Sequence, residues 1–183
     1  MTGSPVMTAK AGEPVAAGKN PAADQVESDS IQVVEFVLGN EHFAIDLFDV
    51  KEVVEYTTIT KLPNVAPYVR GIIDLRGEIT MIIDLKHRLN ITDASTKSLE
   101  ASRIIVLDDH VTKTKMGILV DDVTSVSTFE GNQVDRTSAS VSHEETSIIG
   151  IIKRKIRVKD KDVNELIIWI DIQKLLSALD SAA

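Results

Sequence analysis

Two short acidic clusters hold the side chains that could support catalysis or bind a metal. Asp108-Asp109-His110 and Asp121-Asp122 both follow aliphatic runs, and carboxylates beside a histidine could hold a cation or act as general acid and base. Aspartates at strand ends more commonly serve turns and caps. The four histidines have no i, i+4 spacing, no serine stands in a G-x-S-x-G elbow, and no glycine-rich phosphate loop precedes a helix. We therefore expect no enzyme activity, no metal and no cofactor.

A basic cluster, K-R-K-I-R-V-K, runs from Lys153 to Lys159 in a chain whose formal net charge is −8. On a small β-barrel, such a surface could bind nucleic acid, particularly if aromatic side chains stacked on the bases. No aromatic residue interleaves the cluster, and Trp169 is the nearest. Lysines on a hairpin also protect an exposed strand edge. We favour edge protection or a docking contact, and a nucleic-acid-binding β-barrel protein using residues 153–159 remains the alternative.

One arginine is expected at the tip of a hairpin within the stretch from Leu62 to Leu85. Two aliphatic, β-branched runs, Val69–Leu75 and Ile79–Leu85, predict paired strands. Arg76-Gly77 lies between them, and glycine accepts a positive φ without a Cβ clash, which favours a tight turn. The turn would hold the guanidinium of Arg76 where water or a partner can reach it. A solvated turn arginine is the simpler interpretation.

Composition sets the class of protein. The 183 residues, 43% of them hydrophobic, suffice for one domain or two small sub-barrels that share a core. There is no cysteine, which excludes disulfides and thiolate metal sites. The N-terminus lacks an apolar stretch of signal-peptide length, and no run approaches the roughly 18 apolar residues of a spanning helix. We expect a soluble, cytoplasmic protein with no membrane insertion and a disordered tail over residues 1–30, which are small and polar.

The remaining sequence predicts short strands arranged as two similar halves. A strand at Ile31–Leu38 precedes the motif D-V-x-x-V, which occurs at Asp49–Val53 and again at Asp122–Val126. In each half a hairpin that begins with glycine follows and leads to a capped helical turn. The last turn, from Ile172, continues with leucines at helical spacing, namely Leu175, Leu176 and Leu179. Strands this short and numerous favour small closed barrels, so we expect two five-stranded barrels packed through aliphatic faces.

Several of these segments together resemble the CheW family, the coupling proteins of prokaryotic chemotaxis. The matching pieces occur in family order between Ile31 and Leu179. They are F-x-L-G-N-E-x-F-A-I-D at Phe36–Asp46, V-x-E-V at Val50–Val53, Y-V-R-G-I-I-D-L-R-G at Tyr68–Gly77, I-I-D-L at Ile82–Leu85, G-I-L-V-D-x-V-x-x-V at Gly117–Val126 and I-D-I-x-K-L-L at Ile170–Leu176. The family usually has Asn where Asp74 stands and Pro where Met81 stands, and its second hairpin is shorter and less basic.

The resemblance implies a mainly β fold of two SH3-like five-stranded β-barrel subdomains, with short helical turns and a short C-terminal helix. It places one CheW-like domain at residues 31–183, with sub-barrels at approximately 43–90 and 103–170 and strand 31–38 completing the core. It also implies a non-catalytic scaffold that couples the cytoplasmic tips of chemoreceptors to the regulatory domain of the histidine kinase CheA.

The residues that the resemblance assigns to receptor or kinase binding are mostly aliphatic. A receptor helix could lay an apolar stripe in a groove between them, with an arginine at the rim pairing with a carboxylate or carbonyl. Each valine could equally be ordinary core. The assigned residues are Val50, Glu52, Val53, Gly71, Arg76, Gly117, Val123 and Val126.

Overall fold

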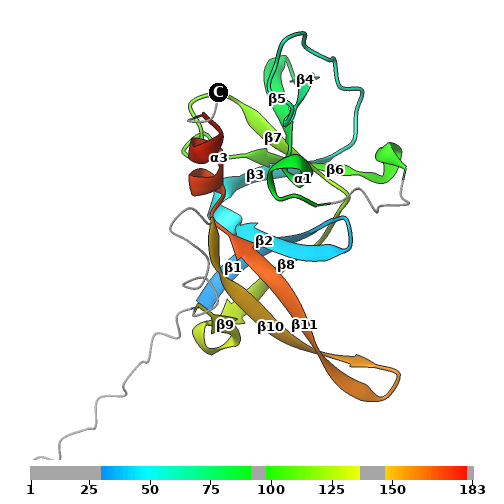
Figure 1. Ribbon diagram of the computed structural model, residues 1–183, viewed down its shortest axis with the longest axis vertical. Helices are drawn as coiled ribbons and strands as arrows, with labels where there is room; N and C mark the ends of the chain where they lie inside the picture. The colour runs from blue at the N-terminus through cyan, green and yellow to red at the C-terminus, as the bar shows by residue number, and fades with distance from the viewer. Residues whose placement is uncertain (1–29, 92–97, 137–146, 181–183) are drawn as a thin grey trace, which may run out of the picture.

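The computed structural model describes residues 30–91, 98–136 and 147–180, apart from the side chains of residues 179 and 180. The expected tail at residues 1–30 therefore lies outside the described residues, except for Ser30. Strands form two sheets, and the prediction of a mainly β fold is confirmed (Figure 1). One sheet contains, in spatial order, β8 (Asp122–Glu130), β1 (Ser30–Leu38), β2 (Glu41–Asp46), β11 (Lys161–Ile170), β10 (Ile148–Val158) and β9 (Val134–Asp135).

The second sheet has five strands, and short helices lie between the strands or, in the case of α3, after the last one. Its spatial order is β3 (Val50–Glu55), β6 (Arg103–Leu107), β7 (Met116–Val120), β5 (Glu78–Asp84) and β4 (Val69–Leu75). The helices are η1 (Leu47–Asp49), α1 (Leu85–Arg88), η2 (Leu99–Ala101), η3 (Gly131–Gln133) and α3 (Ile172–Asp180).

The two halves of the sequence exchange their first hairpins. The hairpin β1–β2 pairs with β8 and β11 of the second half, while β6–β7 pairs with β3 and β5 of the first half. The first strand of each hairpin pairs antiparallel with an edge strand, β1 with β8 and β6 with β3. The second strand pairs parallel with an interior strand, β2 with β11 and β7 with β5. The strands therefore group differently from the expected sub-barrels at 43–90 and 103–170. Similar halves offer equivalent edges to either hairpin, so the repeat alone could not tell pairing within a half from pairing across halves.

Three aliphatic clusters form the core. One contains side chains of the six-stranded sheet alone, including Val33, Ile152 and Trp169. Another contains side chains of the five-stranded sheet alone, such as Ile82 and Ile104. The largest combines both sheets with α3, so it holds the two barrels together. Leu175 and Leu176 of α3 are buried in it as predicted, and the side chain of Leu179 lies outside the described residues.

The predicted turn at Arg76-Gly77 is confirmed. Leu75 pairs with Glu78, and both residues between them have positive φ, 53° for Arg76 and 85° for Gly77. Positive φ at both positions is the type I′ arrangement, whose twist matches that of the flanking strands. The carboxylate of Asp74 accepts a hydrogen bond of 2.7 Å from the backbone N–H of Gly77. Aspartate thus fits the position where the family usually has asparagine, because an acceptor is what the turn requires.

Candidate functional site

Arg76, at the hairpin tip, forms an ion pair with Glu52 of the first D-V-x-x-V motif. Nη1 of Arg76 lies 3.0 Å from Oε1 of Glu52, and Nη2 lies 2.8 Å from Oε2. This two-pronged geometry is the strong form of an arginine–carboxylate pair. It joins the tip of β4–β5 to β3 through two residues that are 24 positions apart in the sequence. The pair is nevertheless open to solvent, because 74% of the Arg76 side chain is exposed.

The two valines of each D-V-x-x-V motif have opposite environments. Val50 and Val123 both pack against the shared core cluster. Val53 and Val126 are 41% and 60% exposed, and both lie on strands at a sheet edge, β3 and β8. The repeat therefore places one anchoring valine and one exposed valine on each edge strand. We call the edge formed by Glu52, Val53 and Arg76 the rim; on β3 the side chain of Val53 points to the opposite face of the sheet from that of Glu52.

The two assigned glycines are buried and shape the five-stranded sheet. A Cβ on Gly71 would lie 2.1 Å from the carbonyl oxygen of Thr60, and φ at Gly71 is +141°. A Cβ on Gly117 would lie 2.8 Å from Cγ2 of Ile104. Both positions therefore allow neighbouring chain segments to approach closely. Neither offers a side chain to a partner.

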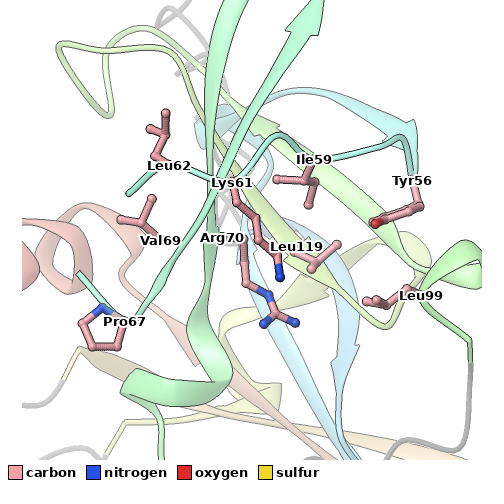
Figure 2. Close-up of a pocket in the computed structure, with 9 residues that line it drawn as sticks. All are labelled: Tyr56, Ile59, Lys61, Leu62, Pro67, Val69, Arg70, Leu99 and Leu119. Atoms are coloured by element: carbon pink, nitrogen blue, oxygen red, sulfur yellow. The ribbon is translucent and has the colours of Figure 1, made fainter. Parts of the chain in front are cut away.

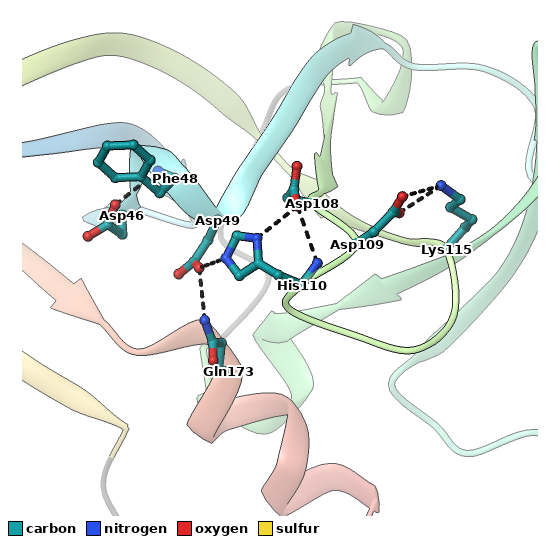
Figure 3. Close-up of polar contacts among 8 residues, drawn as sticks. All are labelled: Asp46, Phe48, Asp49, Asp108, Asp109, His110, Lys115 and Gln173. Carbon is teal, nitrogen blue, oxygen red and sulfur yellow. Dashed lines mark hydrogen bonds and ion pairs between the residues drawn. The ribbon is translucent and has the colours of Figure 1, made fainter.

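The Asp108-Asp109-His110 cluster forms a polar clasp between the two barrels. Nδ1 of His110 lies 2.7 Å from Oδ1 of Asp108, and Nε2 lies 2.9 Å from Oδ1 of Asp49 (Figure 3). Gln173 of α3 donates to the same Asp49 oxygen at 3.1 Å. These hydrogen bonds to two carboxylates raise the pKa of His110, and the bond to His110 lowers the pKa of Asp108. The cluster thus links η1, the loop after β6 and α3.

The second acidic cluster also serves the fold. The side chain of Asp121, which is 7% exposed as a residue, accepts hydrogen bonds of 2.6 Å from the backbone N–H of Gly39 and from Nζ of Lys86. It thereby joins the β1–β2 turn to α1. Within the described residues, no group of three or more His, Asp or Glu side chains could hold a metal ion.

The basic cluster lies on β10, in a hairpin that projects beyond the neighbouring strands (Figure 1). Three of its cations contact carboxylates of this chain: Lys153 with Asp135, Arg154 with Glu35 and Glu165, and Arg157 with Asp162. Trp169 is buried, with the guanidinium carbon of Arg136 5.8 Å from its ring centroid. No stacking surface adjoins the basic residues within the described hairpin.

Comparisons with known proteins bear on this arrangement. A family model described as the CheW-like domain matches residues 32–180. The chain belongs to the CheW-like domain family. The chemotaxis protein CheW of Treponema pallidum is 30% identical over 155 residues, which cover 84% of this chain and 86% of that protein. CheW of Bacillus subtilis is 28% identical over 128 residues, covering 69% of this chain and 80% of that protein.

A solved structure supports the same membership. The crystal structure of the scaffolding protein TtCheW from Thermoanaerobacter tengcongensis matches with a TM-score of 0.63 and 33% sequence identity. The match covers 79% of this chain and 91% of that one. Within the described ranges, no helix has the length and apolar character needed to cross a membrane.

The structure brings together some of the assigned residues and leaves others apart. Glu52 and Arg76 are in direct contact, and Val53 follows Glu52 on β3. Val123 and Val126 lie on the other sheet, and the two glycines lie in the interior. Sequence reasoning did not find the roles of Asp49 and Gln173, which complete the clasp around His110. No local pattern marks these contacts, since 61 residues separate Asp49 from His110 and 124 separate it from Gln173.

Proposed function

We propose that this chain is a non-catalytic, cytoplasmic chemotaxis scaffold that couples the tips of chemoreceptors to the histidine kinase CheA. Membership of the CheW-like domain family supports this function. The observation that carries it is the rim, where Arg76 and Glu52 form a solvent-exposed two-pronged ion pair on the edge strand that also carries the exposed Val53. A helix with an apolar stripe and a polar flank has complementary chemistry to this surface.

The rim is prepared for binding before a partner arrives. Glu52 uses the two terminal nitrogens of Arg76, so the planar guanidinium is already held in one orientation. A guanidinium has five N–H donors, and the remaining donors can reach a carboxylate or a helix-end carbonyl of a partner. Holding a flexible side chain in place in advance reduces the entropy that binding must remove.

Replacing Arg76 tests this function directly. We expect Arg76→Ala to bind a receptor cytoplasmic fragment, or to support receptor control of CheA, about tenfold less well, because a charged hydrogen bond contributes about 1–3 kcal/mol. Arg76→Lys should lose less. The melting temperature should change little, since an exposed ion pair contributes at most about 1 kcal/mol to stability.

Arg157→Ala is the matched control. Arg157 also lies on a hairpin, has a side chain that is 74% exposed and contacts a carboxylate, Asp162. This variant should bind the receptor fragment and CheA as the wild type does. Normal binding of both partners by a normally melting Arg76→Ala variant would show that the rim is not the site.

A further inference from the structure

The five-stranded sheet has a hollow of about 320 Å³ between its two edge strands, β3 and β4. This hollow is separate from the rim. The sheet ends in β3 on one side and β4 on the other, and residues 56–62 cross the space between these two edges. The hollow is lined by Tyr56, Ile59, Lys61, Val69, Arg70 and Leu119, among others (Figure 2). It shares no residue with the rim.

The walls of this hollow are fixed by backbone contacts. The N–H of Thr60 donates to the carbonyl of Ile72, and the N–H of Ile72 donates to the carbonyl of Thr60, both at 2.9 Å. Gly71 permits this approach, because any Cβ there would collide with Thr60. The segment that carries Ile59 and Lys61 is therefore held against β4, which carries Val69 and Arg70.

The lining combines two cations with an apolar floor. The side chains of Lys61 and Arg70 extend toward the same space, next to Leu119 (Figure 2). Nε of Arg70 lies 3.4 Å from Oδ2 of Asp84. The two terminal nitrogens of the Arg70 guanidinium can still donate to a ligand in the hollow. No carboxylate belongs to the lining formed by the described residues. Two cations that face an apolar hollow whose described lining contains no carboxylate are unexpected in a chain of net charge −8.

We propose that this pocket binds the carboxylate of an amphipathic acid, with an aliphatic group on the floor formed by Ile59, Val69 and Leu119. Lys61 supplies a mobile ammonium and Arg70 a planar guanidinium, and together they suit one carboxylate. The aliphatic group removes apolar surface from water, which gives the site a preference over simple anions. Such a ligand has two sources, the C-terminal residue of a protein segment or a free fatty acid.

The test is a titration of the full chain with two probes, in which methyl NMR signals report binding. The probes are N-acetyl-L-leucine, which represents a peptide C-terminus, and octanoate, which represents a fatty acid. We expect the methyl signals of Ile59, Val69 and Leu119 to shift and saturate with at least one probe, and the probe that binds more tightly identifies the source. N-acetyl-L-leucinamide has the same side chain without the charge and should cause no saturable shift.

Variants separate a built site from general attraction. Lys61→Gln should weaken binding of the carboxylate probe about tenfold, since one charged contact is lost. Lys113→Gln removes an exposed lysine that lines a different pocket and should leave binding unchanged. Arg70→Gln should also weaken binding, with folding checked by the melting temperature because Arg70 contacts Asp84. Equal binding of the amide, shifts confined to other residues, or unchanged binding by Lys61→Gln would overturn the proposal.

Discussion

Arg76 serves the fold and the proposed partner surface with different parts of one side chain. Its terminal nitrogens bind Glu52 and so fasten the β4–β5 tip to β3, while 74% of the side chain remains exposed. The sequence predicted the exposed hairpin position of Arg76 and, separately, the importance of Glu52. Their contact joins these two assignments into one feature, because a strand pairing elsewhere in the sheet brings the tip over β3.

The valines of the first motif allow stability and binding to be separated. Val50 packs against the shared core, whereas Val53 is 41% exposed. We expect Val50→Ala to lower the free energy of unfolding by about 1 kcal/mol, because apolar surface is lost from a partly buried site. Val53→Ala should change it by no more than about 0.5 kcal/mol and should instead weaken binding to the receptor fragment. Chemical denaturation and binding, measured on both variants, check this. The reverse pattern would place Val53 in the core and remove it from the rim.

The histidine clasp makes stability depend on pH. The pKa of His110 is raised in the folded state by Asp108 and Asp49, so folding favours the protonated ring. Its contribution is fully present below the unfolded pKa of about 6.5 and is lost as the pH rises through the higher folded value. The lowered pKa of Asp108 acts at the other end, since that contribution is lost as the pH falls through the folded pKa, below 3.8.

Replacing His110 should remove the change in stability that occurs as the pH rises through the pKa of His110. The groups that face His110 are Asp49 and Asp108, with Gln173 bound to Asp49 and Lys51 acting on Asp108. We expect His110→Gln to be less stable than wild type near pH 6, and the difference to shrink toward about pH 9. Melting curves across this range check the expectation, and an NMR titration should place the His110 pKa above its usual value. A stability difference that is constant with pH would mean that the charge on His110 is not involved.

At the scale of elements, two contacts join the β3 side of the five-stranded sheet to the β4–β5 hairpin. The Thr60–Ile72 bridge meets the middle of β4, and the Glu52–Arg76 pair meets the hairpin tip. Both draw β3, or the segment after it, toward the β4–β5 hairpin. The bridge requires a residue without a side chain at position 71, whereas the turn at Gly77 has open space around it.

Two glycine substitutions distinguish these requirements. Gly71→Ala should lower the free energy of unfolding by more than about 2 kcal/mol, because it combines an unfavourable φ with a collision against backbone. Gly77→Ala has only the unfavourable φ and should lower it by about 1 kcal/mol. Urea denaturation of the two variants gives the comparison. A Gly71→Ala variant as stable as Gly77→Ala would mean that the bridge can open at little cost.

At the scale of the whole molecule, the exchange of hairpins makes the two barrels interdependent. Residues before the 92–97 connection include β1 to β5, and residues after it include β6 to β11. Neither group contains all strands of either sheet, because β1–β2 belong with β8–β11 and β6–β7 belong with β3–β5. The shared core cluster adds a second dependence, since it draws side chains from both sheets and α3.

Dividing the chain within this connection should therefore abolish folding of each half. We expect fragments 1–94 and 95–183 to lack cooperative unfolding when they are separate and to regain the strand spectrum by circular dichroism when they are mixed. Each fragment exposes unpaired strand edges and half of the shared core when alone. A separate fragment that unfolds cooperatively would contradict the interdependence of the barrels.

The sequence by itself determined the features that depend on local chemistry. The hairpin at Arg76-Gly77 follows from glycine's tolerance of positive φ, and Asp46, Asp84 and Asp171 accept hydrogen bonds from the first turns that they precede. Family motifs identified the chain, because their residues occur in order along it. Each of these features is determined by a few residues that are neighbours in the sequence.

Only the tertiary structure decided which strands pair and which distant side chains meet. The repeat made the two hairpins equivalent, and long-range pairing across the halves then moved β6 and β7 into the five-stranded sheet. The contacts of Glu52 with Arg76, and of His110 with Asp49, join residues 24 and 61 positions apart. Such contacts depend on the burial of whole faces and not on any local preference, so aliphatic strands of similar composition cannot specify their partners from sequence pattern alone.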